Sequence, residues 1–357
     1  MTVRDTFKDK DITYYNKQSQ YLREKPVSIQ PIEHSLRLQN DCKRPIDWDN
    51  GCLFNLGQKE YIATLDGGYV GSEGGVFDDE SIYVLNNTYP QSPGGGDVIQ
   101  FDELVTIVQK WGYGYYHWMA ECFPRLIQFY KDYDGDLSKV KILTWDTPFV
   151  RQYFKLLGID EQQLVPFKNG VIYKSRKLYI PTPIHCGNPH INSLLDIRNE
   201  KSLSGFYPPN FESKTKDTED RVNILISREG QPKRALKDFD KLHKLLMENT
   251  LNWTKDREKW VIFDGMNIEE TIKLFSKAKL IVGVHGAGLV NSVYSPKDCK
   301  VIEILPVKDC TINLCHWHTI SSLGLNYRMV PVNFSNTSSV VAVDFNLLGK
   351  TIKDFKK

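Results

Sequence analysis

LIVGVHGAGLVN, residues 280–291, is the stretch that decides the fold. Four apolar residues lead into a histidine flanked by glycines, which indicates a buried strand that ends in a tight turn. In parallel sheets, such a strand end followed by a helix start is where ligands bind. His285 would end the strand, and Gly286, Ala287 and Gly288 would let backbone N–H groups approach phosphate oxygens. A purely structural turn explains the string equally well, because the G-x-G-x-x-G motif is incomplete.

The chain around this segment alternates strand and helix patterns. Strands are predicted at VNILISR, KWVIFD, LIVGVH, KVIEILP and NYRMVPV, and helices at DFDKLHKLLMEN and IEETIKLFSKA. This alternation predicts an α/β fold with a doubly wound parallel sheet. Upstream, residues 50–100 read as strand pairs, HWMAECFPRLIQFYKDY as a helix interrupted at Pro124, and the following segment as a β-α-β unit with Gly158 as helix stop.

The length of 357 residues predicts two domains. The segment around 206–221 concentrates proline, charge and polar residues, as linkers do. We therefore expect an N-terminal domain at 1–205, a linker at 206–221 and a C-terminal domain at 222–340. Residues 341–357 read as a terminal helix, with packing back on the N-terminal domain as one option.

Composition narrows the function classes. Apolar content of 41% and charged content of 25% are those of a globular protein. The net charge of +2 disfavours nucleic acid as a partner. We expect no transmembrane segment, because no run of about 18 apolar residues occurs. The N-terminus lacks an apolar signal-peptide centre, so we expect either a cytoplasmic protein or one from which a targeting segment has been removed.

Two arginines follow the strand VNILISR. Ser227 and Arg228 end this strand, and Arg234 lies six residues further on. Guanidiniums near a strand end can clamp a diphosphate in bidentate fashion. A solvated charge run is the alternative. We favour the clamp, because this strand end and that of the glycine segment meet at one edge of the predicted sheet.

A third candidate lies in YGYYHWMAECFPRL. His117 and Glu121 are four residues apart and share a face if the segment is helical. A carboxylate held near a histidine suits general-base catalysis. Taken alone, an amphipathic helix whose glutamate faces water is the better interpretation.

The cysteines raise the possibility of a metal site. Cys310 and Cys315 lie close in sequence to His316 and His318. We favour packed or paired cysteines, because no second ligand pair with zinc-site spacing is present. We therefore expect no metal site.

HWMAECFPRL, LISREGQPKR, VGVHGAGLVNSVY and VIEILP, in this order, resemble glycosyltransferase family sixty-one over about residues 60–335. The resemblance implies a GT-B architecture, in which two Rossmann-like domains face an interdomain cleft and the C-terminal domain holds the nucleotide sugar. It also implies inversion at the anomeric carbon without a metal ion. Many members have Asn where Gly114 stands here, which affects the acceptor contacts expected at that position.

The resemblance assigns residues to roles. The family's H-x-x-x-(D/E) pattern falls on His117 and Glu121, with Glu121 as the expected base and His117 orienting it or the acceptor. Glu303 would bind ribose hydroxyls or cap a turn. The donor site would comprise Ser227, Arg228, Arg234, His285, Gly286, Ala287, Gly288, Asn291 and Glu303.

The resemblance implies transfer of xylose, N-acetylglucosamine or arabinose from a UDP-sugar to a hydroxyl of a glycan or glycoprotein, with no further cofactor. Two alternatives stay open. One is an enzyme like the polysaccharide pyruvyltransferases, and the other is a non-catalytic sugar-binding protein on the same fold.

Overall fold

The computed structural model describes residues 2–4, 12–13, 47–48, 61–83, 96–184, 191–199, 221–228, 234–250, 260–307, 311–333 and 340–355. The chain divides into two compact units. Unit 1 comprises Met1–Leu22 and Leu53–Leu203, and unit 2 comprises Arg23–Cys52 and Ser204–Lys357. Of the linker predicted at 206–221, all but Arg221 lie outside the described residues.

Unit 2 is built on a five-stranded sheet in which every neighbouring pair is parallel, with the order β14-β12-β15-β16-β18. Its strands are β12 (Val222–Ile226), β14 (Trp260–Phe263), β15 (Ala278–Val284), β16 (Lys300–Val307) and β18 (Asn326–Asn333). All residues of β12 are buried, as expected of a strand covered on both faces. The parallel sheet predicted for this part of the chain is confirmed.

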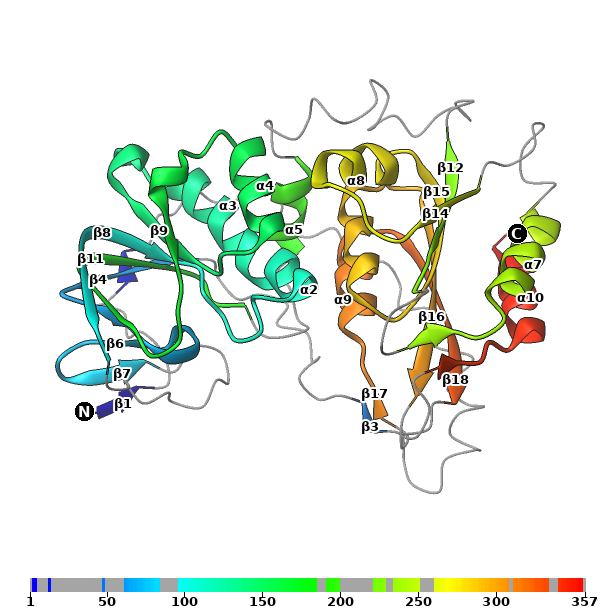
Figure 1. Ribbon diagram of the computed structural model, residues 1–357, viewed down its shortest axis with the longest axis horizontal. Coiled ribbons are helices and arrows are strands. Elements are labelled where there is room, and N and C mark those ends of the chain that lie inside the picture. The colour runs from blue at the N-terminus through cyan, green and yellow to red at the C-terminus, as the bar shows by residue number, and fades with distance from the viewer. Residues whose placement is uncertain are drawn as a thin grey trace. The chain divides into compact units, whose positions relative to one another are not determined.

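Helices cover both faces of this sheet (Figure 1). On one face α7 (Phe239–Thr250) packs against α10 (Phe345–Asp354). On the other face lie α8 (Ile268–Phe275), the 3₁₀ helix η7 (Ala287–Tyr294) and α9 (Cys315–Ser322), with η7 in contact with both helices. Apolar side chains of α10, including Leu348 and Ile352, join the core formed by β12, β15 and β16. The C-terminal helix therefore completes the core of unit 2.

Short strands flank the main sheet of unit 2. β13 (Ala235–Leu236) pairs with β19 (Val340–Val341), and β17 (Thr311–Ile312) pairs with β3 (Asp47–Trp48).

Unit 1 contains a mixed ten-stranded sheet, within which β11, β8, β9 and β10 are parallel neighbours. Antiparallel pairs connect β5, β6 and β7 and place β4 and β5 beside β11, which confirms the strand pairs expected before residue 100. The strands are β1 (Thr2–Arg4), β2 (Ile12–Thr13), β4 (Ile62–Asp66), β5 (Tyr69–Val70), β6 (Val76–Phe77), β7 (Ser81–Tyr83), β8 (Val98–Thr106), β9 (Lys141–Thr144), β10 (Leu164–Pro166) and β11 (Ile172–Pro181).

The helices of unit 1 follow the parallel strands. Among the residues of unit 1 that the structure describes, they are α2 (Tyr115–His117), α3 (Phe123–Asp132), α4 (Pro148–Leu156) and α5 (Ile191–Arg198). After α4, Gly158 adopts a φ of 68°, a left-handed conformation that glycine tolerates best. This confirms the predicted helix stop.

One turn of π-helix, η4 (Trp118–Cys122), joins α2 to α3. The backbone N–H of Phe123 bonds to the carbonyl of Trp118, five residues earlier. Pro124 has no N–H to continue an α-helical ladder, which explains why the regular helix is interrupted at this point. The break predicted at Pro124 is therefore confirmed as a π turn.

Arg125 anchors α3 to the strand ends beside it. Its fully buried guanidinium donates to the carbonyls of Thr106, Val108 and Pro181, at 3.0–3.1 Å. Burial lowers the pKa of Arg125 to about 10, so the side chain stays charged at neutral pH. In the described part of the chain, no helix is long and apolar enough to cross a membrane.

Candidate active site

The carboxyl ends of β12 and β15 form the first candidate site. These strands are neighbours in the sheet. The strand that follows β12 in the chain is β14, which pairs with the side of β12 away from β15. The strand that follows β15 is β16, which pairs with the side of β15 away from β12. The connections therefore leave in opposite directions, which makes this edge the topological switch point of the sheet, where doubly wound proteins bind ligands. Ser227 and Arg228 follow β12 here, and His285 and Gly286 follow β15.

Arg228 lies directly against the glycine turn. A Cβ atom added to Gly286 would overlap Nη1 of Arg228, so a larger residue at this position would displace the arginine side chain. A Cβ atom at Gly288 would lie 3.0 Å from Cγ2 of Ile226, which shows how closely the turn packs on β12. Ala287 begins η7, whose first N–H groups have no acceptor within the helix.

A second guanidinium belongs to the same edge. Burial, together with the positive charge of Arg234, lowers the pKa of Arg228 below its ordinary value. Burial also lowers the pKa of Arg234, partly offset by the charges of Cys315 and Glu303. Two half-buried cations that repel each other favour an anionic ligand, because a ligand with two negative charges removes the repulsion.

His285 is held by a buried carboxylate. Its Nδ1 lies 2.5 Å from Oε1 of Glu303, while Tyr327 on β18 donates to Oε2 of Glu303 at 2.5 Å. Burial opposes ionisation of Glu303, but the charge and hydrogen bond of His285 and the hydrogen bond from Tyr327 hold its pKa below the ordinary value. The ionised carboxylate therefore accepts a hydrogen bond from the N–H at Nδ1 of His285, and Nε2 is the ring nitrogen left for a ligand. Because Glu303 is fully buried with both oxygens engaged, it positions His285.

Asn291, expected at the donor site, lies one turn into η7 and is almost completely buried. Ser227 is largely buried, and its backbone N–H donates to the carbonyl of Phe263 at 2.7 Å. The structure thus brings Ser227, Arg228, Arg234, the turn 285–288 and Glu303 to one edge of unit 2, with Asn291 behind the turn.

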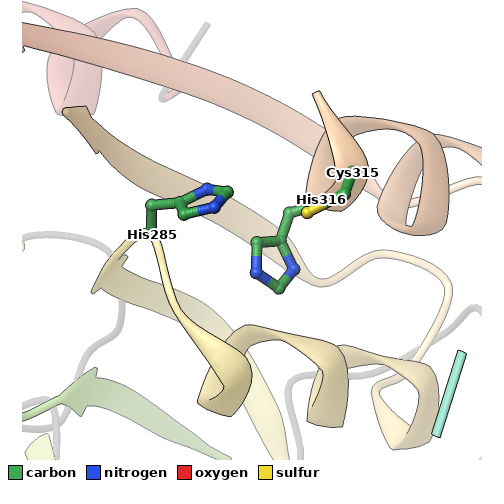
Figure 2. Close-up of side chains that lie close together, drawn as sticks. All are labelled: His285, Cys315 and His316. Carbon is green, nitrogen blue, oxygen red and sulfur yellow. The ribbon is translucent and has the colours of Figure 1, made fainter. Parts of the chain in front are cut away.

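Three possible metal ligands also meet at this edge. Figure 2 shows His285 on the turn after β15, and Cys315 and His316 on the first turn of α9. One ligand atom from each lies within 4.8 Å of the other two. Burial lowers the pKa of His316 to about 3, so its imidazole is neutral, as a metal ligand must be. Two imidazoles and a thiol match the ligand types of zinc, whereas the neighbouring guanidiniums favour an anion.

The cysteine and histidine cluster suggested by the sequence assembles differently. Cys315 and His316 are joined by His285, a partner distant in the chain. Cys310 lies outside the described residues, and His318 is buried.

Unit 1 contains the second candidate site. Nδ1 of His117 lies 2.9 Å from Oε1 of Glu121, and Nε2 of Gln109 donates to Oε2 of Glu121 at 3.3 Å. The Glu121 side chain is completely buried, whereas that of His117 is 28% exposed. The amphipathic alternative, with Glu121 facing water, is therefore wrong. The accessible group of this pair is the imidazole.

Sequence reasoning missed several contributors. Tyr327 comes from the last strand of the sheet, Gln109 from the turn after β8, and Arg125 from α3. Each acts through a contact distant in the chain, so no local pattern marks it.

Known proteins match the region that contains these clusters. The family model described as Glycosyltransferase 61 matches residues 115–302. The Beta-1,2-xylosyltransferase RCN11 of Oryza sativa subsp. japonica is 27% identical over 97 residues. This alignment covers 26% of the present chain and 17% of the xylosyltransferase, so the chain spans only a small part of that relative. The family match spans more than half of the chain and includes His117, Glu121 and the glycine turn. The chain belongs to the glycosyltransferase 61 family.

Proposed function

We propose that this glycosyltransferase is an inverting, metal-independent enzyme that moves a sugar from a UDP-sugar to a hydroxyl of a glycan or glycoprotein. The observation that carries the proposal is the meeting of Arg228, Arg234 and the glycine turn at the switch point of the parallel sheet in unit 2. We also retain GT-B as the proposed fold class, with the nucleotide sugar held by unit 2.

On the donor side, the diphosphate of the nucleotide sugar is the anion that these groups would bind. Arg228 and Arg234 would neutralise the charge that develops on the leaving UDP, and the first N–H groups of η7 would add hydrogen bonds. Nε2 of His285 would donate to the same phosphates when the ring is protonated, with Glu303 stabilising that charge. These cations take the place that a divalent metal occupies in metal-dependent transferases.

On the acceptor side, we propose His117 as the general base. The sequence interpretation gave this role to Glu121, with His117 orienting it. Burial favours the reverse assignment, because a completely buried carboxylate cannot meet an acceptor hydroxyl, whereas the imidazole is partly exposed. Glu121 would fix the ring through Nδ1 and stabilise the imidazolium, and Gln109 would hold Glu121.

The reaction then proceeds in one displacement. The acceptor oxygen forms a bond to the anomeric carbon while its proton passes to Nε2 of His117. The bond between the anomeric carbon and the phosphate oxygen breaks, and UDP leaves with the electron pair. Attack opposite the leaving group inverts the anomeric configuration.

The sugar is proposed from the family and its relative. Xylose, N-acetylglucosamine and arabinose are the candidates, and the relative's name makes UDP-xylose the first donor to test.

The deciding experiment is a thermal-shift screen with UDP, GDP, CMP and phosphoenolpyruvate, followed by mass spectrometry of products from the three UDP-sugars. Selective stabilisation by UDP and a sugar-transfer product support the proposal. Stabilisation by phosphoenolpyruvate alone would indicate a pyruvyltransferase. Binding of sugar without turnover of any donor would indicate a non-catalytic binding protein. The matched variant is Arg228→Ala, whose melting temperature should no longer rise on addition of UDP.

A further inference from the structure

A tight turn between β8 and α2 carries two exposed aromatic side chains beside His117. Trp111 is 43% exposed and Tyr113 is 58% exposed. The rings of Trp111 and His117 have centroids 5.5 Å apart and are tilted by 43°. The indole therefore lies against the imidazole of the proposed base, the phenol is exposed on the same turn, and no role in the reaction described above uses either ring.

The turn is held rigidly by its surroundings. Gln109 bonds to both backbone groups of Ile184, and its carbonyl accepts from Nε1 of Trp145 at 2.9 Å. A Cβ atom at Gly112 would lie 2.7 Å from atoms of both Trp145 and Cys122, so the backbone sits as close to them as glycine permits. The N–H of Gly114 closes the turn on the carbonyl of Trp111 at 2.8 Å. The backbone of the turn at Trp111 is thus held by contacts that do not involve the indole.

Trp111 adopts an unfavourable backbone conformation. Its φ of 64° lies in the left-handed region, which bulky side chains rarely occupy. Strain of this kind persists where the surroundings impose it, and it concentrates at ligand sites. A large side chain that is 43% exposed on an unfavourable backbone suits a ligand site, because a ligand can cover the exposed part of the ring.

The polar groups around the ring suit a sugar. Nζ of Lys110 lies 5.2 Å from the Trp111 ring centre and 3.3 Å from a carboxylate oxygen of Glu73. A pyranose presents C–H groups on its faces and hydroxyls around its rim. The electron-rich face of an indole attracts such C–H groups, while the Lys110 ammonium, which lies over the ring, and the Glu73 carboxylate paired with it can bond to the hydroxyls.

We propose that Trp111 and Tyr113 form a stacking platform for a sugar ring of the acceptor, and that this platform places the acceptor hydroxyl against Nε2 of His117. The inference rests on the proposed function and narrows the class of acceptor. The acceptor is a carbohydrate, and a hydroxyl of a bare polypeptide is excluded as the preferred substrate. Tyr113 is supported from behind by Trp145, whose ring meets it edge-on at 5.4 Å.

The test uses the full chain on an array of oligosaccharides of xylose, mannose, N-acetylglucosamine and arabinose, with unglycosylated peptides on the same surface. Wild type should bind at least one oligosaccharide and no peptide. Trp111→Ala should weaken that binding at least tenfold, Trp111→Phe should retain most of it, and Ile99→Ala, an equally exposed side chain on β8, should change nothing. With the best oligosaccharide as acceptor, Trp111→Ala should raise its KM at least tenfold while UDP still stabilises the variant.

Unchanged oligosaccharide binding by Trp111→Ala, or binding of peptides in preference to oligosaccharides, would overturn the platform. So would an absence of oligosaccharide binding by wild type. Loss of the UDP response in Trp111→Ala would also overturn it, because the indole would then support folding or the donor site. Failure of wild type to respond to UDP contradicts the proposed function, and the array result still tests the platform in that case.

Discussion

Nδ1 of His117 lies 2.9 Å from Oε1 of Glu121, and the carboxylate is completely buried while the imidazole is partly exposed. Two residues one helical turn apart therefore differ in what they can touch. The buried member can act only through the exposed one, which is the relationship between a positioning carboxylate and a catalytic histidine.

Removal of the imidazole tests this assignment. His117→Ala should lower kcat/KM by about 10²–10⁴-fold, the usual contribution of a general base, and exogenous imidazole should restore part of the activity. Glu121→Gln should lower kcat/KM by about a hundredfold. The pH profile of kcat/KM should keep its acidic limb in this variant, because the base is still present. The control is His243→Ala, a partly exposed histidine on α7. If the pH profile of kcat/KM loses its acidic limb in Glu121→Gln but keeps it in His117→Ala, then Glu121 is the base.

The phosphate-binding role of the arginines makes a quantitative prediction. Arg228→Ala should weaken UDP binding by about 1.5–3 kcal/mol, the range for a hydrogen bond to a charged group, as measured by calorimetry. Arg234→Ala should act in the same direction. Arg176→Ala, an exposed arginine of unit 1 paired with Asp102, is the matched control and should leave the affinity unchanged. Equal UDP affinity in Arg228→Ala would remove this residue from the phosphate site.

The glycine turn can be tested by adding a single methyl group. Gly286→Ala should displace the Arg228 side chain, because the new Cβ would overlap Nη1, and UDP binding should weaken. Gly349→Ala in α10 has no atom within 4 Å of the new Cβ and should raise the stability by about 0.5–1 kcal/mol, since alanine favours a helix. Calorimetry and thermal unfolding measure the two effects. Wild-type UDP affinity in Gly286→Ala would show that the loop does not position Arg228.

The buried histidine predicts a pH dependence of stability. Burial, with the charges of His285 and Arg234, lowers the pKa of His316 to about 3, against the attraction of Glu303. Between about pH 6.5 and pH 3 the unfolded chain binds a proton at this position and the folded chain does not, so stability falls as the pH falls through this window. The slope from this group approaches about 1.4 kcal/mol per pH unit.

Chemical unfolding at pH 7 and pH 5 measures this slope. His316→Asn should make the loss of stability on acidification smaller, and His243→Asn should leave it as in wild type. An equal slope in wild type and His316→Asn would mean that His316 is protonated in the folded protein.

Chelation tests the metal-independent mechanism against the ligand cluster of His285, Cys315 and His316. EDTA should leave transfer unchanged, because Arg228 and Arg234 supply the positive charge at the diphosphate. Elemental analysis of the purified protein should find no stoichiometric metal. Activity that disappears with EDTA, returns with Zn²⁺ and is lost in Cys315→Ser would instead make the cluster a functional metal site.

Much of unit 2 could be predicted because its signals are local. Buried strands separated by amphipathic helices predict a parallel sheet, and the positions of β12, β14, β15, β16 and β18 agree with the apolar runs. The edge shared by Arg228 and His285 then follows from the direction of the strands. In unit 1, the full extent of β8 was missed, because the first half of this strand is exposed or half-buried and alternates weakly.

By itself, the sequence determined where the strands of the parallel sheet in unit 2 form, where Gly158 ends a helix, and which charged side chains follow β12 and β15. These features depend on residues a few positions apart. The tertiary structure alone decided that Glu121 is buried behind His117, that Tyr327 from another strand holds Glu303, and that a strained turn exposes Trp111. Burial and long-range hydrogen bonds set these roles, and both arise only when segments distant in the chain pack together.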